Sequence, residues 1–197
     1  MKVLHIITSL GQGGAESALY ELIKATHKTI DHNVVSLHDA GAYGPRLKKI
    51  GVNVETLGMP RGKLKFAGLW RLREIIRNYS PDLINTRLYH ADLMGGVVSL
   101  FAGAPPVIWA IHSSDLGSLD KSWKTRFIRR ICAILSYWIP SAIVTDSERA
   151  KKVHISLGYS PKKFIVINNG VDLFTFYRDK IAGQALRQEL QVQGDQI

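Results

Sequence analysis

A glycine-rich segment near the start of the chain, residues 8–16, has the composition of an anion-binding turn. A short apolar run that suits a buried strand precedes it, and apolar residues at helical spacing follow it. A strand, a glycine turn and a helix N-terminus in this order direct free backbone N–H groups and the positive end of the helix dipole into the loop. Glycine also permits positive φ and lets a phosphate approach without a Cβ in the way. We therefore expect Gly13 and Gly14 to bind a phosphate, with a ligand-free tight turn as the alternative.

The loop differs from the common nucleotide-binding fingerprints. The dinucleotide pattern G-x-G-x-x-G requires a third glycine at position 16, where Glu16 stands. No Gly-Lys-Ser/Thr follows, which excludes a Walker loop. One helix terminus contributes only about 0.3–1 kcal/mol toward an exposed anion, so other groups must help to hold a ligand. We expect Glu16 to face a hydroxyl-bearing ligand or to complement the helix N-terminus.

The sequence gives little support to metal or nucleophile chemistry. The seven histidines are scattered, no D-x-D pattern is present, and Cys132 is the only cysteine, so we expect neither a divalent-ion site nor a structural zinc cluster. The G-x-S-x-G elbow of Ser-His-Asp enzymes is absent, and no two acids can be assigned as a glycosidase pair. We therefore predict no metal and no cofactor.

Composition indicates a basic chain with enough apolar residues for a core. At 197 residues and 46% hydrophobic content, the chain can bury one good core and at most two small domains. The net charge of +10 indicates an anionic partner: phosphates, nucleic acid or an acidic membrane surface. A single cysteine suits a reducing cytoplasm, and the longest apolar run, 131–144, is too short to span a bilayer. We expect a soluble cytoplasmic protein, with peripheral attachment to the inner face of the membrane as an option.

The elements that position these residues alternate regularly along the chain. No hairpin signal is clear, and apolar strands alternate with helical patterns, which predicts an α/β domain with a Rossmann-like, mainly parallel sheet and helices on both faces. The helix expected over 66–79 places Leu69, Leu72 and Ile76 inward and its arginines mostly outward. The expected strands are 3–7, 33–37, 52–57, 83–86, 107–111, 142–145 and 164–167.

Residues that could bind a ligand recur at the carboxyl ends of the expected strands. In open parallel sheets, ligands bind beyond those ends, so side chains from several strands should meet there. This convergence is the strongest functional signal in the sequence. The residues concerned are Gly13, Gly14, Arg87, His90, His112, Asp115, Ser147, Asn169 and Gly170.

The helix expected over 121–139 carries a basic face and an apolar one. Arg126, Arg129 and Arg130 share one face, and the apolar stripe lies about a third of a turn away. A solvated outer face is the simplest interpretation of these arginines, and docking on anionic lipid is the alternative. Nucleic-acid binding is permitted by the charge but lacks a stacking platform or recognition-helix motif. The apolar stripe comprises Phe127, Ile131, Ile134, Leu135 and Trp138.

Taken together, these segments resemble the N-terminal half of a retaining glycosyltransferase of family four, with the GT-B fold. The resemblance covers nearly the whole chain in the right order, and it implies two Rossmann-like domains that face each other across a cleft. The N-terminal domain largely binds the acceptor, and the C-terminal domain holds the nucleotide-sugar. The matching segments are Gly13-Gly14-Ala15-Glu16, Pro81-Asp82-Leu83-Ile84, His90-Ala91-Asp92, His112, Asp146-Ser147-Glu148 and Ile167–Asp172.

The resemblance also implies roles for single residues. Gly13 and Gly14 would offer N–H groups to the diphosphate, and His112, the catalytic candidate, would hydrogen-bond a hydroxyl of the transferred sugar. Arg87 and His90 would bind an anionic acceptor, although a structural salt bridge is an equal interpretation of Arg87. The substrate-binding candidates besides the two glycines are Glu16, Arg87, His90, Ser147, Asn169 and Gly170.

The second half of such an enzyme is expected to be absent. The family's donor signature, two glutamates eight residues apart, occurs nowhere. We expect residues 1–175 to form the N-terminal domain and 176–197 the interdomain connection. The chain would then be the acceptor-side half of an enzyme that moves a sugar from a nucleotide-sugar to a glycan or lipid-linked glycan, inactive alone. The alternative is a basic anion-binding module that docks on nucleic acid or anionic membrane without catalysis.

Overall fold

The structure, a computed structural model, describes residues 1–60, 65–112, 122–170, 177 and 179–190. Within them, seven strands form one parallel sheet in the order β3-β2-β1-β4-β5-β6-β7. This confirms the predicted Rossmann-like sheet, because every strand lies within two residues of its predicted bounds. The strands are β1 (Lys2–Ile7), β2 (Asp31–Ser36), β3 (Asn53–Thr56), β4 (Leu83–Arg87), β5 (Val107–Ile111), β6 (Ala142–Thr145) and β7 (Phe164–Val166).

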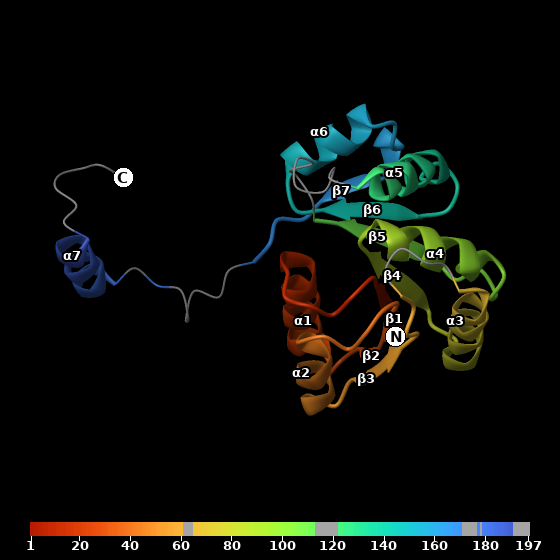
Figure 1. Ribbon diagram of the computed structural model, residues 1–197, viewed down its shortest axis with the longest axis horizontal. Coiled ribbons are helices and arrows are strands. Elements are labelled where there is room, and N and C mark those ends of the chain that lie inside the picture. Colours follow the sequence, from red (N-terminus) through yellow and green to blue (C-terminus); the bar gives the residue numbers. More distant parts are fainter. Residues whose placement is uncertain (61–64, 113–121, 171–176, 178, 191–197) are drawn as a thin grey trace.

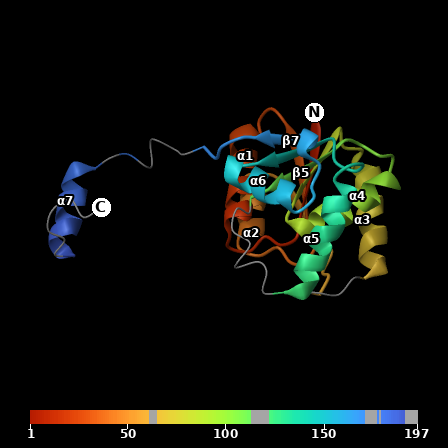
Figure 2. The same ribbon diagram turned by 90° about the horizontal axis from the view of Figure 1, so that it is seen from above.

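Helices cover both faces of the sheet (Figures 1 and 2). The first two lie on one side, and the next three lie side by side on the other, while α6 lies beyond α5 and α7 stands apart from the sheet. None of the helices in the described ranges is long and apolar enough to cross a membrane. The helices are α1 (Gly14–Thr26), α2 (Tyr43–Lys49), α3 (Phe66–Tyr79), α4 (Tyr89–Leu100), α5 (Trp123–Leu135), α6 (Glu148–Ser156) and α7 (Lys180–Glu189), with a 3₁₀ turn at Pro161–Lys163.

The strand order reverses beside β1, at the centre of the sheet. The chain runs outward from β1 to β2 and β3, and then α3 carries it back so that β4 pairs with the other edge of β1. Because β1 is covered on both faces, every residue from Val3 to Ile7 is buried, as expected for a central parallel strand. The loops after β1 and β4 leave in different directions at this point, which opens a crevice at the carboxyl ends of the strands.

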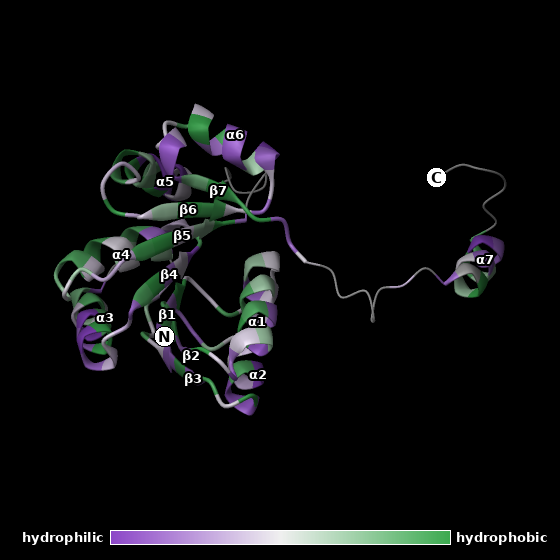
Figure 3. Cartoon of the chain, turned by 180° about the vertical axis from the view of Figure 1, so that it is seen from behind, coloured by the Kyte–Doolittle hydropathy of each residue, from purple (hydrophilic) through white to green (hydrophobic). Residues whose placement is uncertain are grey.

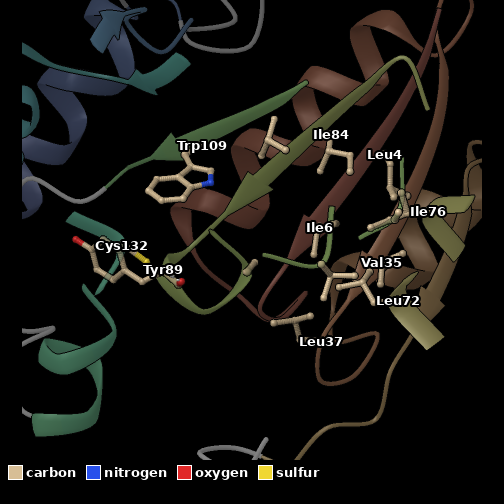
Figure 4. Close-up of a cluster of buried hydrophobic side chains, with 14 of the residues drawn as sticks. Leu4, Ile6, Val35, Leu37, Leu72, Ile76, Ile84, Tyr89, Trp109 and Cys132 are labelled. Atoms are coloured by element: carbon tan, nitrogen blue, oxygen red, sulfur yellow. Dashed lines mark hydrogen bonds between the residues drawn. The ribbon is translucent and has the colours of Figure 1, made fainter. Parts of the chain in front are cut away.

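Two apolar cores lie on the two sides of the sheet. The larger one packs α3 and α4 on the strands, and Figure 4 shows Leu72 and Ile76 beside Leu4 and Ile84. The smaller one lies under α1 and α2. Figure 3 shows the same division, with mostly hydrophobic strands and with hydrophilic segments on α3 and α6. Small residues let α4 pack closely on the sheet, since a Cβ on Gly95 would lie 2.9 Å from the Thr86 side chain.

The two arginine-rich helices on this side bury opposite kinds of residue. In α3, Leu72 and Ile76 are buried and Arg71 and Arg77 are exposed, as predicted. In α5, the buried residues are Arg129, Cys132 and Ala133, while most of the apolar stripe is exposed. The expected solvated face of three arginines is therefore correct for Arg126 and Arg130 and wrong for Arg129.

The physical reason lies in the layer beneath α5, which is partly polar. The Cys132 thiol lies 3.5 Å from the carbonyl oxygen of Tyr89, and the Ser160 N–H donates to the Ser136 hydroxyl at 2.8 Å. A helix face of small and polar residues fits such a layer more closely than a face of large aromatics does. The domain boundary predicted after residue 175 lies outside the described residues, and α7 falls within the predicted connection 176–197.

Candidate functional site

A pocket of about 420 Å³ opens at the carboxyl ends of β1, β4, β5 and β6. It lies where the strand order reverses, and the first turn of α1 forms one wall. Five of the residues selected from the sequence meet there. The lining residues are Thr8, Gly14, Ala15, Glu16, Leu88, Tyr89, His90, Asp92, Ala110, Ile111, His112, Thr125, Asp146 and Asn169.

The two glycines of the turn have different roles. Gly13 is the N-cap of α1 and has extended backbone, φ −168°, and neither Gly13 nor Gly14 has the positive φ that glycine permits. A Cβ on Gly13 would collide with the Glu16 carboxylate, whereas a Cβ on Gly14 would meet no protein atom within 4 Å. Gly13 therefore makes room for Glu16, and Gly14 keeps the pocket open beside the free N–H groups of the helix.

Glu16 lies where both of its predicted roles are possible. It is in the first turn of α1, where a carboxylate complements the helix dipole, and it also lines the pocket. Its side chain is buried and accepts a hydrogen bond from the Ser9 hydroxyl at 3.3 Å. One carboxylate oxygen is thus oriented by the loop itself, which leaves the other available to a ligand hydroxyl.

A buried arginine and a histidine form the polar floor of the pocket. Arg87 ends β4, and its Nη1 lies 2.5 Å from Nε2 of His112. The guanidinium can only donate, so Nε2 of His112 accepts, and the proton of the neutral ring is on Nδ1. That Nδ1 lies 3.7 Å from Oδ2 of Asp146. Burial, and then the Arg87 charge, lower the pKa of His112, and Asp146 opposes this, so the ring is neutral at pH 7.

The arginine contacts the imidazole while remaining a cation. Burial lowers the pKa of Arg87 to about 10, so it stays protonated at neutral pH. Its charge lies beneath the pocket, because Arg87 reaches the pocket only through His112. Both interpretations offered by the sequence, anion binding and a structural contact, are compatible with this position.

Asp92 adds a carboxyl group that the sequence did not select as a site residue. It is fully buried in α4, lines the pocket and accepts a hydrogen bond from the Thr86 hydroxyl. Burial raises the pKa of Asp92 to about 8, against the opposing effects of Thr86 and Arg87. A carboxylic acid that is protonated at neutral pH can donate a hydrogen bond to a ligand, which a carboxylate cannot.

The turn between β4 and α4 carries backbone strain at the pocket wall. Leu88 has φ 72°, a region that side chains rarely adopt, and its carbonyl accepts from the N–H groups of Ala91 and Asp92. Such a conformation costs of order 1–3 kcal/mol and persists where the surroundings impose it, often at functional sites. It directs the next two residues, Tyr89 and His90, into the pocket wall.

The remaining predicted residues lie at the edge of this site or outside it. Burial, and then His38, lower the pKa of His90 in the pocket wall, and Asn169 donates from Nδ2 to Oδ2 of Asp146 at 3.4 Å. Ser147 caps α6 by accepting from the Ala150 N–H at 3.2 Å, and it does not line the pocket. Gly170 is exposed and also lies outside the pocket lining. Asp115 lies outside the described residues.

Sequence reasoning missed several lining residues for identifiable reasons. Asp146 directly follows β6 and was not selected as a site residue, although its position at a strand end was a usable signal. Thr125 comes from within α5, and nothing in the sequence indicates which side of that helix meets the pocket. In the part of the chain that the structure describes, no three His, Cys, Asp or Glu side chains are grouped as a metal site would require.

The comparisons with known proteins agree on one fold, and a family model identifies the family. The family model of Glycosyltransferase Family 4 matches residues 12–174. No curated protein matches the sequence. HepE of Anabaena, solved in complex with UDP, has 25% sequence identity and a TM-score of 0.76, and the match covers 98% of this chain and 50% of that chain. The same protein was solved with UDP-glucose, with 25% identity, a TM-score of 0.73 and the same coverage.

More distant structures share the fold alone. The apo form of WaaB, a lipopolysaccharide outer core galactosyltransferase, has 17% identity and a TM-score of 0.64 over 88% of this chain and 47% of that chain. A UDP-GlcNAc 2-epimerase from Methanocaldococcus jannaschii has 18% identity and a TM-score of 0.58 over 86% of this chain and 46% of that chain. The chain spans about half the length of each of these proteins.

Proposed function

The chain belongs to Glycosyltransferase Family 4, and we propose that it is the acceptor-side half of an enzyme that transfers a sugar from a nucleotide-sugar to an acceptor hydroxyl. The observation that carries this proposal is the pocket at the strand reversal, where a helix N-terminus, a neutral acid and an imidazole backed by a cation converge. HepE was solved with UDP and with UDP-glucose, which supports a nucleotide-sugar as the donor.

The pocket offers complementary groups to the two parts of such a donor. In the transfer, the bond between the anomeric carbon and a diphosphate oxygen breaks, and the acceptor oxygen bonds to that carbon. The leaving diphosphate gains negative charge, which N–H groups at the start of α1 and the charge of Arg87 would stabilise in a site that excludes water. The carboxyl group of Asp92 can donate to a sugar hydroxyl, and the carboxylate of Glu16 can accept from one.

In this proposal His112 keeps the contact with the transferred sugar that the sequence predicts. Its Nε2 accepts from Arg87, so contact with a sugar hydroxyl through this atom requires the arginine to release it. We propose that His112 meets the transferred sugar through the imidazole that lines the pocket, and that Arg87 and Asp146 hold its orientation. His90 and Asn169, which also line the pocket, are then available to the acceptor.

We propose that the second half of the cleft comes from another α/β domain, and that this chain alone transfers no sugar. The chain spans about half the length of HepE and of WaaB, which supports a further domain as the source of the other contacts. Purified alone and mixed with common nucleotide-sugars and glycan acceptors, it should give no product. Clear transfer by the isolated chain would contradict the proposal.

The acceptor is proposed to be a glycan or a lipid-linked glycan, handled beside an anionic membrane surface. The exposed cations Arg126 and Arg130 on α5 supply the electrostatic attraction. Arg129 is buried and does not take part, which corrects the three-arginine surface expected from the sequence.

The pocket is tested by placing a side chain at Gly14 in a protein that carries both halves. Gly14→Val projects two methyl groups into open pocket space without striking protein atoms, so donor turnover should fall by about 100-fold or more while folding is unchanged. Gly11→Val is the matched control, because it lies in the same loop, also has free space and is outside the pocket lining. Full activity in Gly14→Val would contradict the proposed role and show that the loop is a simple turn that binds no ligand.

The histidine needs a variant that separates chemistry from packing. His112→Ala should lower turnover, and it should also cost about 1–3 kcal/mol of stability because it removes the acceptor of the buried Arg87. His112→Asn supplies an acceptor again and should recover part of the stability but little of the activity. An alanine variant that unfolds early and yet keeps full activity would make the histidine structural.

A further inference from the structure

The outward side of α5 is apolar, although this helix lies on the surface of the domain. Trp123, Phe127 and Ile134 are 66%, 58% and 61% exposed, and Trp138, in the turn that continues the helix, is 73% exposed. At 100° per residue the first three lie within about 40° of one another around the helix axis. Large aromatic side chains gathered in this way on a surface indicate an interaction site rather than scattered exposed residues.

Cations flank the apolar strip of α5 on both sides. Arg126 and Arg130 lie along one edge and Lys124 along the other, and all three are exposed. The sequence from 123 to 135 contains no acid, and the chain as a whole carries a net charge of +10. A second copy of the chain on this strip would bring these cations together, which like-charge repulsion disfavours. The complementary partner is therefore an anionic surface with an apolar interior.

A basic groove adjoins the same strip. It has a volume of about 550 Å³ and runs between α5 and the end of α6, with Trp123, Phe127, Arg126 and Arg130 on one wall and Leu157 on the other. Cations beside aromatic side chains in an open groove suit a lipid phosphate with its acyl chains lying alongside. The groove shares no lining residue with the pocket at the strand ends and lacks its acid and imidazole.

The neighbouring helices extend this surface. On α3, Phe66 and Trp70 are exposed, and the guanidinium of Arg73 lies 5.2 Å from the Trp70 ring centroid. Arg73 also donates to the carbonyl of Phe101, whose side chain is exposed just after α4. Three of the four tryptophans of the chain are thus exposed on the side of the sheet that carries α3 to α5 (Figure 2).

We propose that the outward side of α5 inserts into the interfacial layer of an anionic lipid bilayer, with Trp123, Phe127 and Ile134 at the boundary of the acyl chains and the flanking cations on lipid phosphates. A helix with aromatic and aliphatic residues on one side and arginine and lysine along its edges lies in the plane of such an interface. This inference rests on the membrane contact proposed above and specifies how it is made. On its inner side the same helix contributes Thr125 to the pocket, so insertion would hold the pocket beside the lipid surface.

The test measures vesicle binding by the 197-residue chain. Vesicles of phosphatidylcholine with phosphatidylglycerol should sediment the chain, and pure phosphatidylcholine should not. The combined variant Trp123→Gln, Phe127→Gln and Ile134→Gln should weaken binding by about tenfold or more, since apolar burial drives insertion. Leu22→Gln, an exposed apolar residue on α1 at the other side of the sheet, is the matched control and should leave binding unchanged. The circular dichroism spectrum of each variant verifies the fold.

Insertion itself is read from tryptophan fluorescence with bromine placed in the lipid acyl chains. Quenching should occur on binding and should fall when Trp123 and Trp138 are replaced by Phe, leaving at most the contribution of the exposed Trp70, while Trp109, which is fully buried, stays unquenched. Salt-sensitive binding without quenching would overturn insertion and leave an electrostatic contact only. No binding to anionic vesicles would overturn both membrane proposals, and a dimer abolished by the triple Gln variant would assign the strip to a second copy.

Transfer to a soluble acceptor separates this inference from the proposed enzyme. In a protein with both halves, the triple Gln variant should keep its turnover of a soluble acceptor while it loses vesicle binding. An active enzyme that never binds vesicles would overturn only the membrane inference. A vesicle-binding protein without transfer activity would overturn only the enzyme.

Discussion

Helices α3 and α5 cover the same side of the sheet, and both carry several arginines on an amphipathic pattern, yet they bury opposite sides. In α3 the aliphatic residues Leu72 and Ile76 face the sheet. In α5 Arg129 and Cys132 face inward, and the aromatic residues face outward. An amphipathic pattern thus identifies a stripe on a helix, but the direction of that stripe depends on the residues against which the helix packs.

The layers beneath the two helices account for the difference. Below α3 lie the apolar side chains of the larger core, shown in Figure 4. Cys132 and Ala133 of α5 belong to the same core, but beside them lie the Tyr89 carbonyl and the imidazole of His154, whose pKa the charge of Arg129 helps to lower after burial itself. Apolar side chains are stabilised by the first layer, whereas small and polar ones satisfy the hydrogen-bonding groups of the second.

The largest expected effect is the chemical protection of Cys132. This thiol is fully buried on the inner side of α5, and burial raises its pKa, so it should react with a thiol reagent at least about a thousandfold more slowly than in the unfolded chain. The comparison depends on this result, because a helix turned with its aromatic residues inward would expose the cysteine. Absorbance-monitored labelling in native buffer and in denaturant measures the ratio. A rate close to the denatured one would contradict the orientation of α5.

A pair of truncations compares the apolar stripes directly. Leu72→Ala on α3 removes a fully buried side chain and should lower the free energy of unfolding by about 2–5 kcal/mol. Phe127→Ala on α5 removes a larger side chain that is already exposed and should change it by no more than about 0.5 kcal/mol. Urea denaturation of both variants supplies the two values. Similar losses at the two sites would mean that α5 buries its apolar side as α3 does.

The sequence predicted the order of elements because each strand is a short β-rich run and each helix has its own period. Parallel strands joined by helices leave few topologies, so the Rossmann-like sheet followed from local patterns. Those patterns do not predict which side of a helix faces the sheet. Nothing within 123–135 specifies that Arg129 meets a polar layer made by α4 and α6. That layer assembles only when distant segments pack together.

The residues of the site likewise fall into those that the sequence reveals and those that depend on the packing of distant segments. Strand ends are visible in the sequence, so Gly14, His112 and Asn169 were placed correctly around one pocket. Asp92 was missed as a site residue because its protonation depends on complete burial, which a single sequence does not show. Positive φ at the pocket occurs at Leu88 and not at Gly13 or Gly14, and a residue with a side chain gives no signal for it.

The buried and exposed arginines of α5 provide the next test. Arg129→Ala should cost about 1–3 kcal/mol, since it removes a buried stem and charged hydrogen-bonding groups. Arg126→Ala, one turn earlier and exposed, should stay within about 0.5 kcal/mol. Thermal and urea denaturation of the two variants, side by side, measure the difference. Equal small effects would place both arginines in solvent and restore the face of three arginines expected from the sequence.

The smallest expected effect concerns pH and the polar layer under α5. His154 accepts from the Tyr89 hydroxyl at Nε2, 2.7 Å away, because its Nδ1 donates to the carbonyl of Ala150 at 2.8 Å. The neutral ring satisfies both partners, and burial lowers its pKa below the usual 6.5. The folded state therefore binds fewer protons than the unfolded state below that pH. The stability that this histidine contributes is fully present above about pH 6.5 and is lost as the pH falls toward the folded pKa, by at most about 1.4 kcal/mol per pH unit.

Replacing His154 separates its contribution to the pH dependence of stability from that of His5, whose pKa burial lowers to about 3. The chain with His154→Gln should lose less stability between pH 7 and pH 5 than the parent chain, because His5 remains in both. Urea denaturation at three pH values measures the two slopes, and hydrogen exchange should show that acid loosens α5 and α6 before α3. The aliphatic layer beneath α3 contains no group that titrates there, so acid should act on that helix only through global unfolding. Identical slopes in the two chains, or exchange that accelerates first in α3, would show that the layer under α5 is no more polar in energetic terms than the one under α3.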